Sequence, residues 1–362
     1  MREIFKVKGK EMKNIDILVG LQFGSEGKGR VTADIAKYYE GGMRVQSIQA
    51  GHTVFHNRKK YVMRTIPCTW VNPNCELLIG AGAFIRLDLL EQELEMLKDF
   101  NVLDRLKIDT RATIVEERHA VYERKSNLKE GIGSTCEGAG SSLCEKLMRG
   151  TGVIRVGERQ EWFADRGIKI GDTIGHVHDT KMKLLIEGAQ GTLLSVHTSP
   201  YYPFVTSREC TATGILSETG FPIGNVRNVL GVFRTYPIRV GGNSGAAGRK
   251  ELTWEEITKR SGYPGKLEEY TTVTKRLRRI FEFSMVDFVY ALRVNEPTHL
   301  FMTFADYIDW EQTEYANVLT TKVHDFVKRL EIIRGRKIGY ISTKFHYLWR
   351  LYHGLDVGVV RW

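Results

Sequence analysis

A glycine-rich turn that carries a lysine offers the clearest chemistry in this sequence. Residues 15–30 read IDILVGLQFGSEGKGR, an apolar run followed by glycines on both sides of Lys28. Backbone N–H groups in such a turn close on an anion at the start of the next helix, and the lysine adds a point charge. The spacing departs from the Walker A pattern, because Gln22 stands where its first glycine belongs and Gly29 where its serine or threonine belongs. We predict a phosphate-binding loop, and the pattern leaves a plain structural loop open.

A second group of chemically active residues is basic. Lys275, Arg276, Arg278 and Arg279 lie together, and the chain carries a formal net charge of +10. This charge favours either a nucleic-acid binder or an enzyme that collects several anionic substrates in one cleft. A solvated basic surface is the third interpretation, and composition alone leaves all three open.

The elements that must position these residues alternate between strands and helices along the chain. Apolar, β-type runs are followed by helical patterns, which is typical of an α/β fold. A helix is expected near 320–334, because Val323, Phe326, Val327 and Leu330 share one face. The predicted strands are 15–20, 45–49, 76–80, 183–187, 228–235, 299–304 and 337–342, and the other predicted helices are 30–39 and 88–98.

Length and composition indicate a soluble globular protein. The 362 residues can bury a large core, 42% of them are hydrophobic, and no apolar run reaches the length of a membrane span. The N-terminus lacks the apolar core of an export signal, and five cysteines without CxxC spacing fit a reducing cytoplasm, or a host cytoplasm for a viral protein. We predict an N-terminal extension over 1–14 and a single domain over 15–362, with glycine-rich loops at 131–140 and 241–248.

Further segments, taken with the first loop, resemble one known family. They are IQAGHTVFHN (48–57), GIGSTCEGAGSSLCEKLMRG (131–150), IEGAQGTLLSVHTSPYYPFVTS (186–207), YPIRVGG (236–242), TTVTKRLRR (271–279) and ISTKF (341–345). In order and spacing they resemble adenylosuccinate synthetase. The resemblance implies one large α/β domain with a mainly parallel central sheet, related to P-loop nucleotide-binding folds. It also implies a ligase that phosphorylates O6 of a purine nucleotide with a nucleoside triphosphate and then displaces phosphate with the amino group of aspartate.

The resemblance also implies roles for individual residues. Lys28 would bind the phosphates, His52 would be the acid that stabilises charge between the donor phosphates and O6, and Gln190 would bind the 6-oxo edge of the purine. Ser25 takes the position of the family's catalytic aspartate, and Arg149 would reach the nucleotide of a partner subunit, which implies a homodimer. The implied nucleotide-binding residues are Gly24, Ser25, Glu26, Gly27, Lys28, Gly29, Gln49, Ala50, Gly51, His52, Thr53, Ser134, Thr135, Arg149, Gln190, Thr206, Val240, Asp306 and Ser342; the aspartate-binding residues are Val273, Thr274, Arg276 and Arg278, and the Mg²⁺ ligands are the carbonyl of Gly51 and Ser25.

One departure from the family pattern bears on the purine. The family's first loop reads GDEGKG, and its aspartate takes the proton from purine N1, whereas this chain has Ser25, which cannot serve as that base. The smaller side chain leaves room for a 2-amino group, and serine marks the phage-type members, the N6-succino-2-amino-2′-deoxyadenylate synthases, which condense dGMP with aspartate on the pathway to 2-aminoadenine DNA. We therefore expect dGMP as substrate. The N1 proton acceptor stays open between Glu26, a phosphate oxygen and ordered water.

The donor base is expected to be adenine. The family's guanine-reading TKLD motif is matched here by residues 303–306, Thr-Phe-Ala-Asp, and an aromatic residue in place of lysine stacks on any purine. We expect ATP or dATP with Mg²⁺ rather than GTP, and neither a membrane nor a nucleic acid as partner. Two alternatives stay open: an ordinary adenylosuccinate synthetase that uses IMP and GTP, and a catalytically silent, basic protein that binds nucleotides or nucleic acid.

Overall fold

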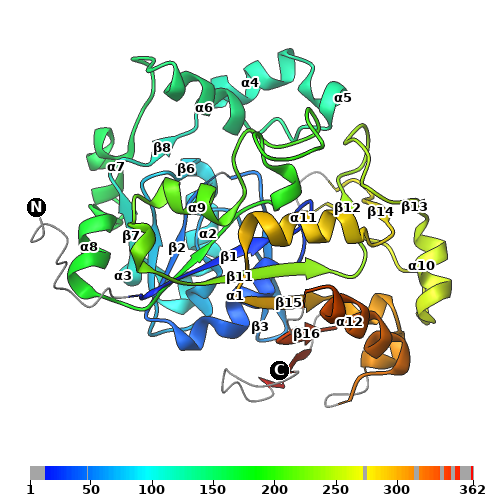
Figure 1. The fold of residues 1–362 in the computed structure, drawn as a ribbon. Coiled ribbons are helices and arrows are strands. Elements are labelled where there is room, and N and C mark those ends of the chain that lie inside the picture. Colours follow the sequence, from blue (N-terminus) through cyan, green and yellow to red (C-terminus); the bar gives the residue numbers. More distant parts are fainter. Residues whose placement is uncertain are drawn as a thin grey trace, which may run out of the picture.

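A computed structural model describes residues 13–46, 48–271, 275–313, 318–334, 338–343, 347–350 and 360–361. An 11-stranded sheet crosses the molecule in the order β18-β17-β16-β15-β11-β1-β10-β2-β5-β7-β9 (Figure 1). Neighbouring strands from β16 to β9 pair in parallel, and β17 and β18 pair antiparallel, which confirms the predicted α/β fold with a mainly parallel sheet. The strands are β1 (Ile15–Gly20), β2 (Gly41–Arg44), β5 (Glu76–Ile79), β7 (Leu106–Asp109), β9 (Lys169–Gly171), β10 (Leu184–Glu187), β11 (Val226–Arg234), β15 (His299–Thr303), β16 (Tyr340–Ser342), β17 (Tyr347–Arg350) and β18 (Val360–Arg361).

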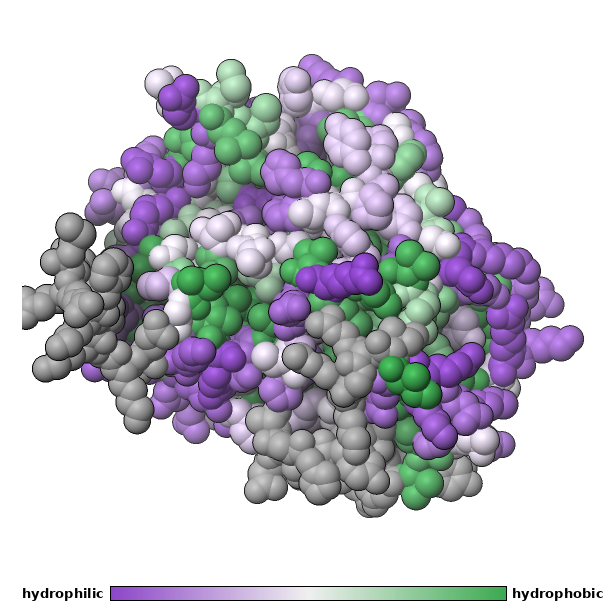
Figure 2. All heavy atoms as spheres, viewed as in Figure 1, coloured by the Kyte–Doolittle hydropathy of each residue, from purple (hydrophilic) through white to green (hydrophobic). Residues whose placement is uncertain are grey.

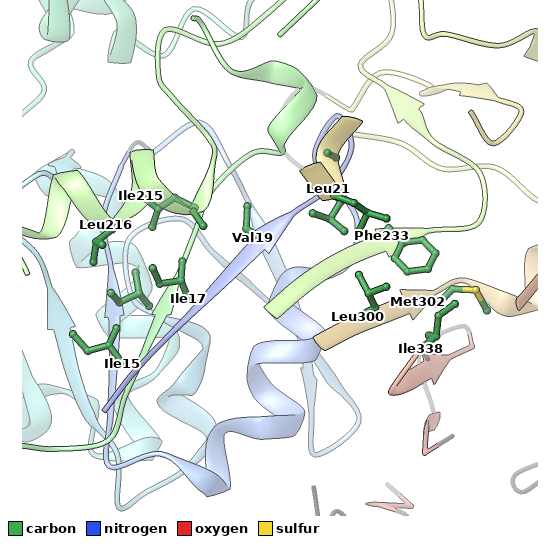
Figure 3. Close-up of a cluster of buried hydrophobic side chains, with 14 of the residues drawn as sticks. Ile15, Ile17, Val19, Leu21, Ile215, Leu216, Phe233, Leu300, Met302 and Ile338 are labelled. Carbon is green, nitrogen blue, oxygen red and sulfur yellow. The ribbon is translucent and has the colours of Figure 1, made fainter. Parts of the chain in front are cut away.

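Helices cover both faces of the central strands. Ile17 and Val19 of β1 share a buried cluster with Ile215 of α9 on one face (Figure 3), and Leu18 shares another with Val31 of α1 on the other. Because both faces are covered, most side chains of the central strands are buried and apolar, and a few charged residues such as Asp16 and Glu187 are buried among them. The helices are α1 (Lys28–Ile35), α2 (Leu87–Met96), α3 (Val102–Arg105), α4 (Glu117–Lys125), α5 (Leu128–Ile132), α6 (Ala139–Leu147), α7 (Gln160–Ala164), α8 (Thr173–Thr180), α9 (Ala212–Thr219), α10 (Trp254–Ser261), α11 (Met285–Asn295) and α12 (Thr321–Arg334).

The last helix confirms the amphipathic pattern read from the sequence. Val323, Val327 and Leu330 of α12 are buried in the main core, and Phe326 packs against it. In the part of the chain that the structure describes, no helix is both long enough and apolar enough to cross a membrane.

Small sheets extend the fold beyond the central strands. A hairpin packs on α1, and a three-stranded sheet carries the basic segment found in the sequence. These additions follow the carboxyl ends of parallel strands, the edge at which α/β proteins bind ligands. They are β3 (His52–His56) with β4 (Lys59–Met63), β12 (Ile238–Arg239) with β14 (Arg279–Phe281) and β13 (Glu251–Leu252), and β6 (Phe84–Ile85) with β8 (Thr113–Ile114).

The strand predicted at 45–49 was wrong. The strand is β2, Gly41–Arg44, and the chain turns at Gln46, whose φ is 73°. Glycine is unfavourable in strands, so the two glycines at the start of β2 hid it, and the sequence pattern indicated the apolar residues that follow. Gly42 is selected by packing instead, because a Cβ there would lie 1.8 Å from Oγ1 of Thr69. The loop predicted at 131–140 is also shorter than expected, since α5 ends at Ile132 and α6 begins at Ala139.

Candidate active site

A cavity of about 510 Å³ lies at the carboxyl edge of the sheet. Its walls come from the loops that follow β1, β10 and β15, from the start of β3, and from the segment that precedes β14. The cavity therefore gathers most of the residues that the sequence analysis singled out. Those that line it are Gly24, Ser25, Gly27, Lys28, Gly29, Gln49, Ala50, Gly51, His52, Thr53, Thr135, Gln190, Val240 and Arg278.

The predicted phosphate loop joins β1 to α1, and Lys28 is the first residue of that helix. Its Nζ lies 2.8 Å from Oε2 of Glu26 and donates a second hydrogen bond to the carbonyl of Gln190. The glycine that replaces the Walker A serine has a packing reason: a Cβ on Gly29 would lie 2.8 Å from Cβ of His52. Helix α1 therefore packs directly on β3, which brings the ammonium group and the imidazole to one wall.

Glu26 turns its carboxylate into the loop and away from the cavity. The side chain is fully buried, and Oε1 accepts hydrogen bonds from the backbone N–H groups of Gln22 (3.1 Å) and Gly24 (2.8 Å). Oε2 accepts from Lys28. Both oxygens are thus used to shape the loop, and Glu26 is not placed to take a proton from a bound purine.

His52 is held by a buried carboxylate. Its Nδ1 is hydrogen-bonded to Oε1 of Glu187 at the end of β10, and Oε2 of Glu187 accepts from the backbone N–H of Cys68 at 2.7 Å. An ionised carboxylate only accepts hydrogen bonds, so Nδ1 carries the proton and Nε2 is the nitrogen left for the cavity. Burial lowers the pKa of His52 from 6.5 to about 4, and the charges of Arg44 and Lys28 add to this effect against the opposing charge of Glu187. At neutral pH the free protein therefore holds a neutral imidazole whose Nε2 accepts.

This protonation state predicts proton uptake when a polyphosphate binds. Phosphate charge beside Nε2 favours the imidazolium, so the pKa of His52 rises and a fraction of a proton is taken from solvent. Isothermal titration with ATP at pH 7, in two buffers of different ionisation enthalpy, measures this uptake. The His52→Asn variant is the control, because it keeps the protonation of ATP itself and removes that of the imidazole; equal uptake by both proteins would contradict the prediction.

Two groups of residues could hold a metal ion, and the oxygen atoms in the cavity wall are better suited than the cluster around His52. The ligand atoms of His52, Cys68 and Glu187 lie within 4.8 Å of one another, as in a metal site. However, burial raises the pKa of the Cys68 thiol well above its usual value, so the thiolate that a soft metal needs is absent at neutral pH. Ser25 and Gly51 both line the cavity and offer a hydroxyl and a carbonyl oxygen, which suit Mg²⁺ alongside phosphate and water oxygens.

Other predicted residues lie near the cavity with their own partners. Nε2 of Gln49 donates to Oγ1 of Thr206 at 2.6 Å, and the backbone carbonyl of Gln190 accepts from Nζ of Lys28. Val273 and Thr274 fall outside the described residues. The predicted residues that do not line the cavity are Glu26, Ser134, Arg149, Thr206, Arg276, Asp306 and Ser342.

Sequence reasoning missed two residues that shape this site. Glu187 orients His52, and Arg44 donates to the carbonyl of Ala50 at 2.7 Å, which fixes the segment before His52. A carboxylate at the end of the buried run LLIE was a usable signal, because a buried charge requires a partner. Arg44 ends a short strand and gave no comparable signal.

The chain matches proteins of one known family. The family model described as adenylosuccinate synthetase matches residues 17–166 and 158–315. Adenylosuccinate synthetase of Pyrococcus horikoshii is 35% identical over 340 residues, covering 90% of this chain and 95% of that protein. The N6-succino-2-amino-2′-deoxyadenylate synthase of Vibrio phage phiVC8 is 33% identical over 311 residues, covering 82% and 87%.

A solved structure has the same fold. It is the succinoaminodeoxyadenylate synthetase of cyanophage S-2L, bound to dGMP and to dATP as an energy donor. It matches with a TM-score of 0.77 and 28% identity, covering 92% of this chain and 93% of that chain. This chain therefore belongs to the adenylosuccinate synthetase family, and it is a nucleotide-binding ligase that forms a C–N bond in purine biosynthesis.

Proposed function

We propose that this ligase condenses dGMP with L-aspartate to N6-succino-2-amino-2′-deoxyadenylate, with ATP or dATP as phosphoryl donor. Ser25 is the observation that carries the proposal, because it puts a small, uncharged side chain in the cavity at the position of the family's catalytic aspartate. Lys28, His52, Gln190 and Arg278 line the same cavity. Similarity to the cyanophage S-2L enzyme, which binds dGMP and dATP, supports the same assignment.

The Ser25 position suits guanine in two ways. The short side chain leaves space beside purine N1 for the 2-amino group, and its hydroxyl oxygen accepts a hydrogen bond from that group. The carboxylate of Glu26 is occupied by loop N–H groups and Lys28, so the N1 proton goes to a phosphate oxygen or to water.

The reaction proceeds in two displacements. In the first, guanine O6 attacks the γ-phosphorus, the O6–P bond forms, and the bond to the leaving diphosphate breaks. Lys28 and the loop N–H groups bind the donor phosphates, His52 as imidazolium donates Nε2–H to the developing charge, and Gln190 holds the 6-oxo edge. In the second, the aspartate amine attacks C6 and phosphate leaves. The carbonyl of Gly51 and the hydroxyl of Ser25 would hold Mg²⁺, which would neutralise negative charge on the phosphates.

Phe304 supports an adenine donor. Its ring lines the cavity with the guanidinium carbon of Arg234 4.0 Å from its centroid. An aromatic ring stacks on any purine, whereas guanine selection needs an exposed acceptor for N1–H and the 2-amino group. Asp306, which follows in the same segment, is fully buried and does not line the cavity. Both observations favour ATP or dATP over GTP.

The second candidate is an ordinary adenylosuccinate synthetase that uses IMP. Similarity to the Pyrococcus horikoshii enzyme, which is as strong as that to the phage enzymes, favours it. It needs another group to accept the N1 proton of hypoxanthine, because Ser25 cannot ionise near neutral pH.

A homodimer completes the proposal. Arg149 lies two residues after the end of α6. The side chains of Leu147 and Met148, just before it, are 71% and 76% exposed. Figure 2 shows hydrophobic surface over this region at the top of the view. Exposed apolar side chains next to an arginine that is proposed to reach a partner subunit support a contact surface here. A monomer in sedimentation experiments would overturn this part.

An activity screen tests the proposal directly. The wild-type protein is incubated with aspartate, Mg²⁺ and each combination of dGMP, GMP, IMP and dIMP with ATP, dATP and GTP. We expect the succino-adduct of dGMP with ADP and phosphate as the main products, and poor reaction of IMP. Equal or faster turnover of IMP would overturn the assignment of dGMP and favour the second candidate, an ordinary adenylosuccinate synthetase.

A further inference from the structure

A buried guanidinium joins three walls of the cavity. Arg234 ends β11 and has no exposed surface, although it carries a full charge. Its Nη1 donates to the carbonyl of Ser25 at 3.2 Å and to Oε2 of Glu269 at 3.3 Å, and its Nη2 donates to Oε1 of Glu269. The ring of Phe304 lies against it at 4.0 Å. One side chain thus contacts the phosphate loop, the segment before β14 and the segment after β15.

Glu269 is the common partner of this cluster. Oε1 also accepts from the hydroxyl of Tyr307 at 2.7 Å, and Oε2 accepts from Nη1 of Arg278 at 3.2 Å. Burial alone would raise the pKa of Glu269, but the charges of Arg234 and Arg278 lower it to about 2. Glu269 lines the cavity and is therefore a permanent negative charge in its wall.

The negative charge of Glu269 lies beside the site at which aspartate, itself an anion, is expected to bind. Arg278 is one of the guanidinium groups proposed to bind the carboxylates of aspartate, and it already contacts Glu269. Two positive charges face one fixed carboxylate, so a single net positive charge is left for the substrate. Without Arg234, Glu269 would be neutralised by Arg278 alone, and the attraction of the Arg278 guanidinium for the incoming carboxylates would be largely cancelled.

We propose that Arg234 is a positioning residue for the aspartate subsite: it neutralises Glu269 and so leaves Arg278 free to bind substrate carboxylate. The inference rests on the proposed function only in taking aspartate as the amine donor. It is independent of which purine reacts. The contact with the carbonyl of Ser25 further ties the subsite to the phosphate loop.

Replacement of Arg234 tests this role when its effect on the KM for aspartate is compared with its effect on the KM for the purine nucleotide. Arg234→Met should raise the KM for aspartate about 10-fold or more, as expected when a desolvated carboxylate loses its counter-charge, while the KM for the purine nucleotide changes less than about twofold. Arg234→Lys keeps the charge and should stay near the wild-type KM. The double variant Arg234→Met, Glu269→Gln removes the unneutralised carboxylate and should recover most of the loss.

Arg227 provides a matched control on the same strand. It lies at the other end of β11, where it pairs with the buried carboxylate of Asp16 at 2.9 Å (Nε to Oδ1). Arg227→Met should lower the melting temperature in the same way as Arg234→Met, but it should leave the KM for aspartate unchanged. The control separates loss of stability from loss of the subsite.

The assay uses whichever of dGMP and IMP the wild type converts, so a wrong purine does not affect this test. Where neither purine reacts, direct titration of aspartate replaces the KM. An unchanged aspartate KM or affinity in Arg234→Met, parallel changes in all three substrates, or no recovery in the double variant would overturn the inference. A wild type that does not bind aspartate would overturn it together with the proposed function.

Discussion

His52→Asn is expected to lower kcat by about 100-fold or more with little change in nucleotide affinity. Asparagine can place its amide nitrogen near the position of Nδ1, so it keeps a donor for Glu187 and preserves the buried hydrogen bond. It lacks a group at the position of Nε2, the nitrogen left for the cavity. The variant thus removes the charge-stabilising donor without leaving a carboxylate unpaired. Steady-state kinetics with the purine that the wild type converts measure the effect.

A second histidine on the same strand is the control for this variant. His56 ends β3 and packs edge-on against the rings of Trp70 and Phe100, away from the cavity wall. His56→Asn should therefore reduce stability and leave kcat close to that of the wild type. Near-normal kcat in His52→Asn would assign His52 a structural role beside Glu187.

The phosphate loop could be predicted because its information is local. The apolar run of β1 and the glycines around Lys28 are adjacent in the chain, and a strand followed by such a turn has few structural alternatives. The same holds for α12, whose buried face follows from its own spacing. Local patterns therefore identified the fold class and one wall of the cavity.

Residues that act through distant partners could not be predicted in this way. His52 and Glu187 are separated by 135 positions, and they meet because β10 lies beside β2 and the hairpin packs on α1. Arg234 contacts Ser25 across 209 positions, because β11 is the neighbour of β1. In the sequence Arg234 is only a charged residue at the end of an apolar run. The strand order that gives it a function is a property of the whole sheet.

Ser25→Asp is expected to reverse the preference between purines. Ser25 has a φ of 59°, in the left-handed region that aspartate and asparagine tolerate, and its side chain is exposed in the cavity, so the substitution should not disturb folding. The new carboxylate restores a base for N1 of hypoxanthine and fills the space proposed for the 2-amino group. Since general-base catalysis contributes at least about 100-fold, the ratio of kcat/KM for dGMP to that for IMP should fall by about that factor.

Ser25→Asn separates the two causes of this shift. Asparagine has nearly the volume of aspartate but no charge, so it should reduce turnover of dGMP without increasing that of IMP. A carboxylate can also accept hydrogen bonds from both N1–H and the 2-amino group of guanine, which would improve dGMP binding in Ser25→Asp and leave Ser25→Asn impaired. Whether the dGMP-to-IMP ratio of kcat/KM falls or rises in Ser25→Asp therefore decides whether the size or the charge of the side chain at position 25 selects the purine. An undiminished dGMP-to-IMP ratio in both variants would mean that position 25 does not select the purine, and that the serine is compatible with either substrate.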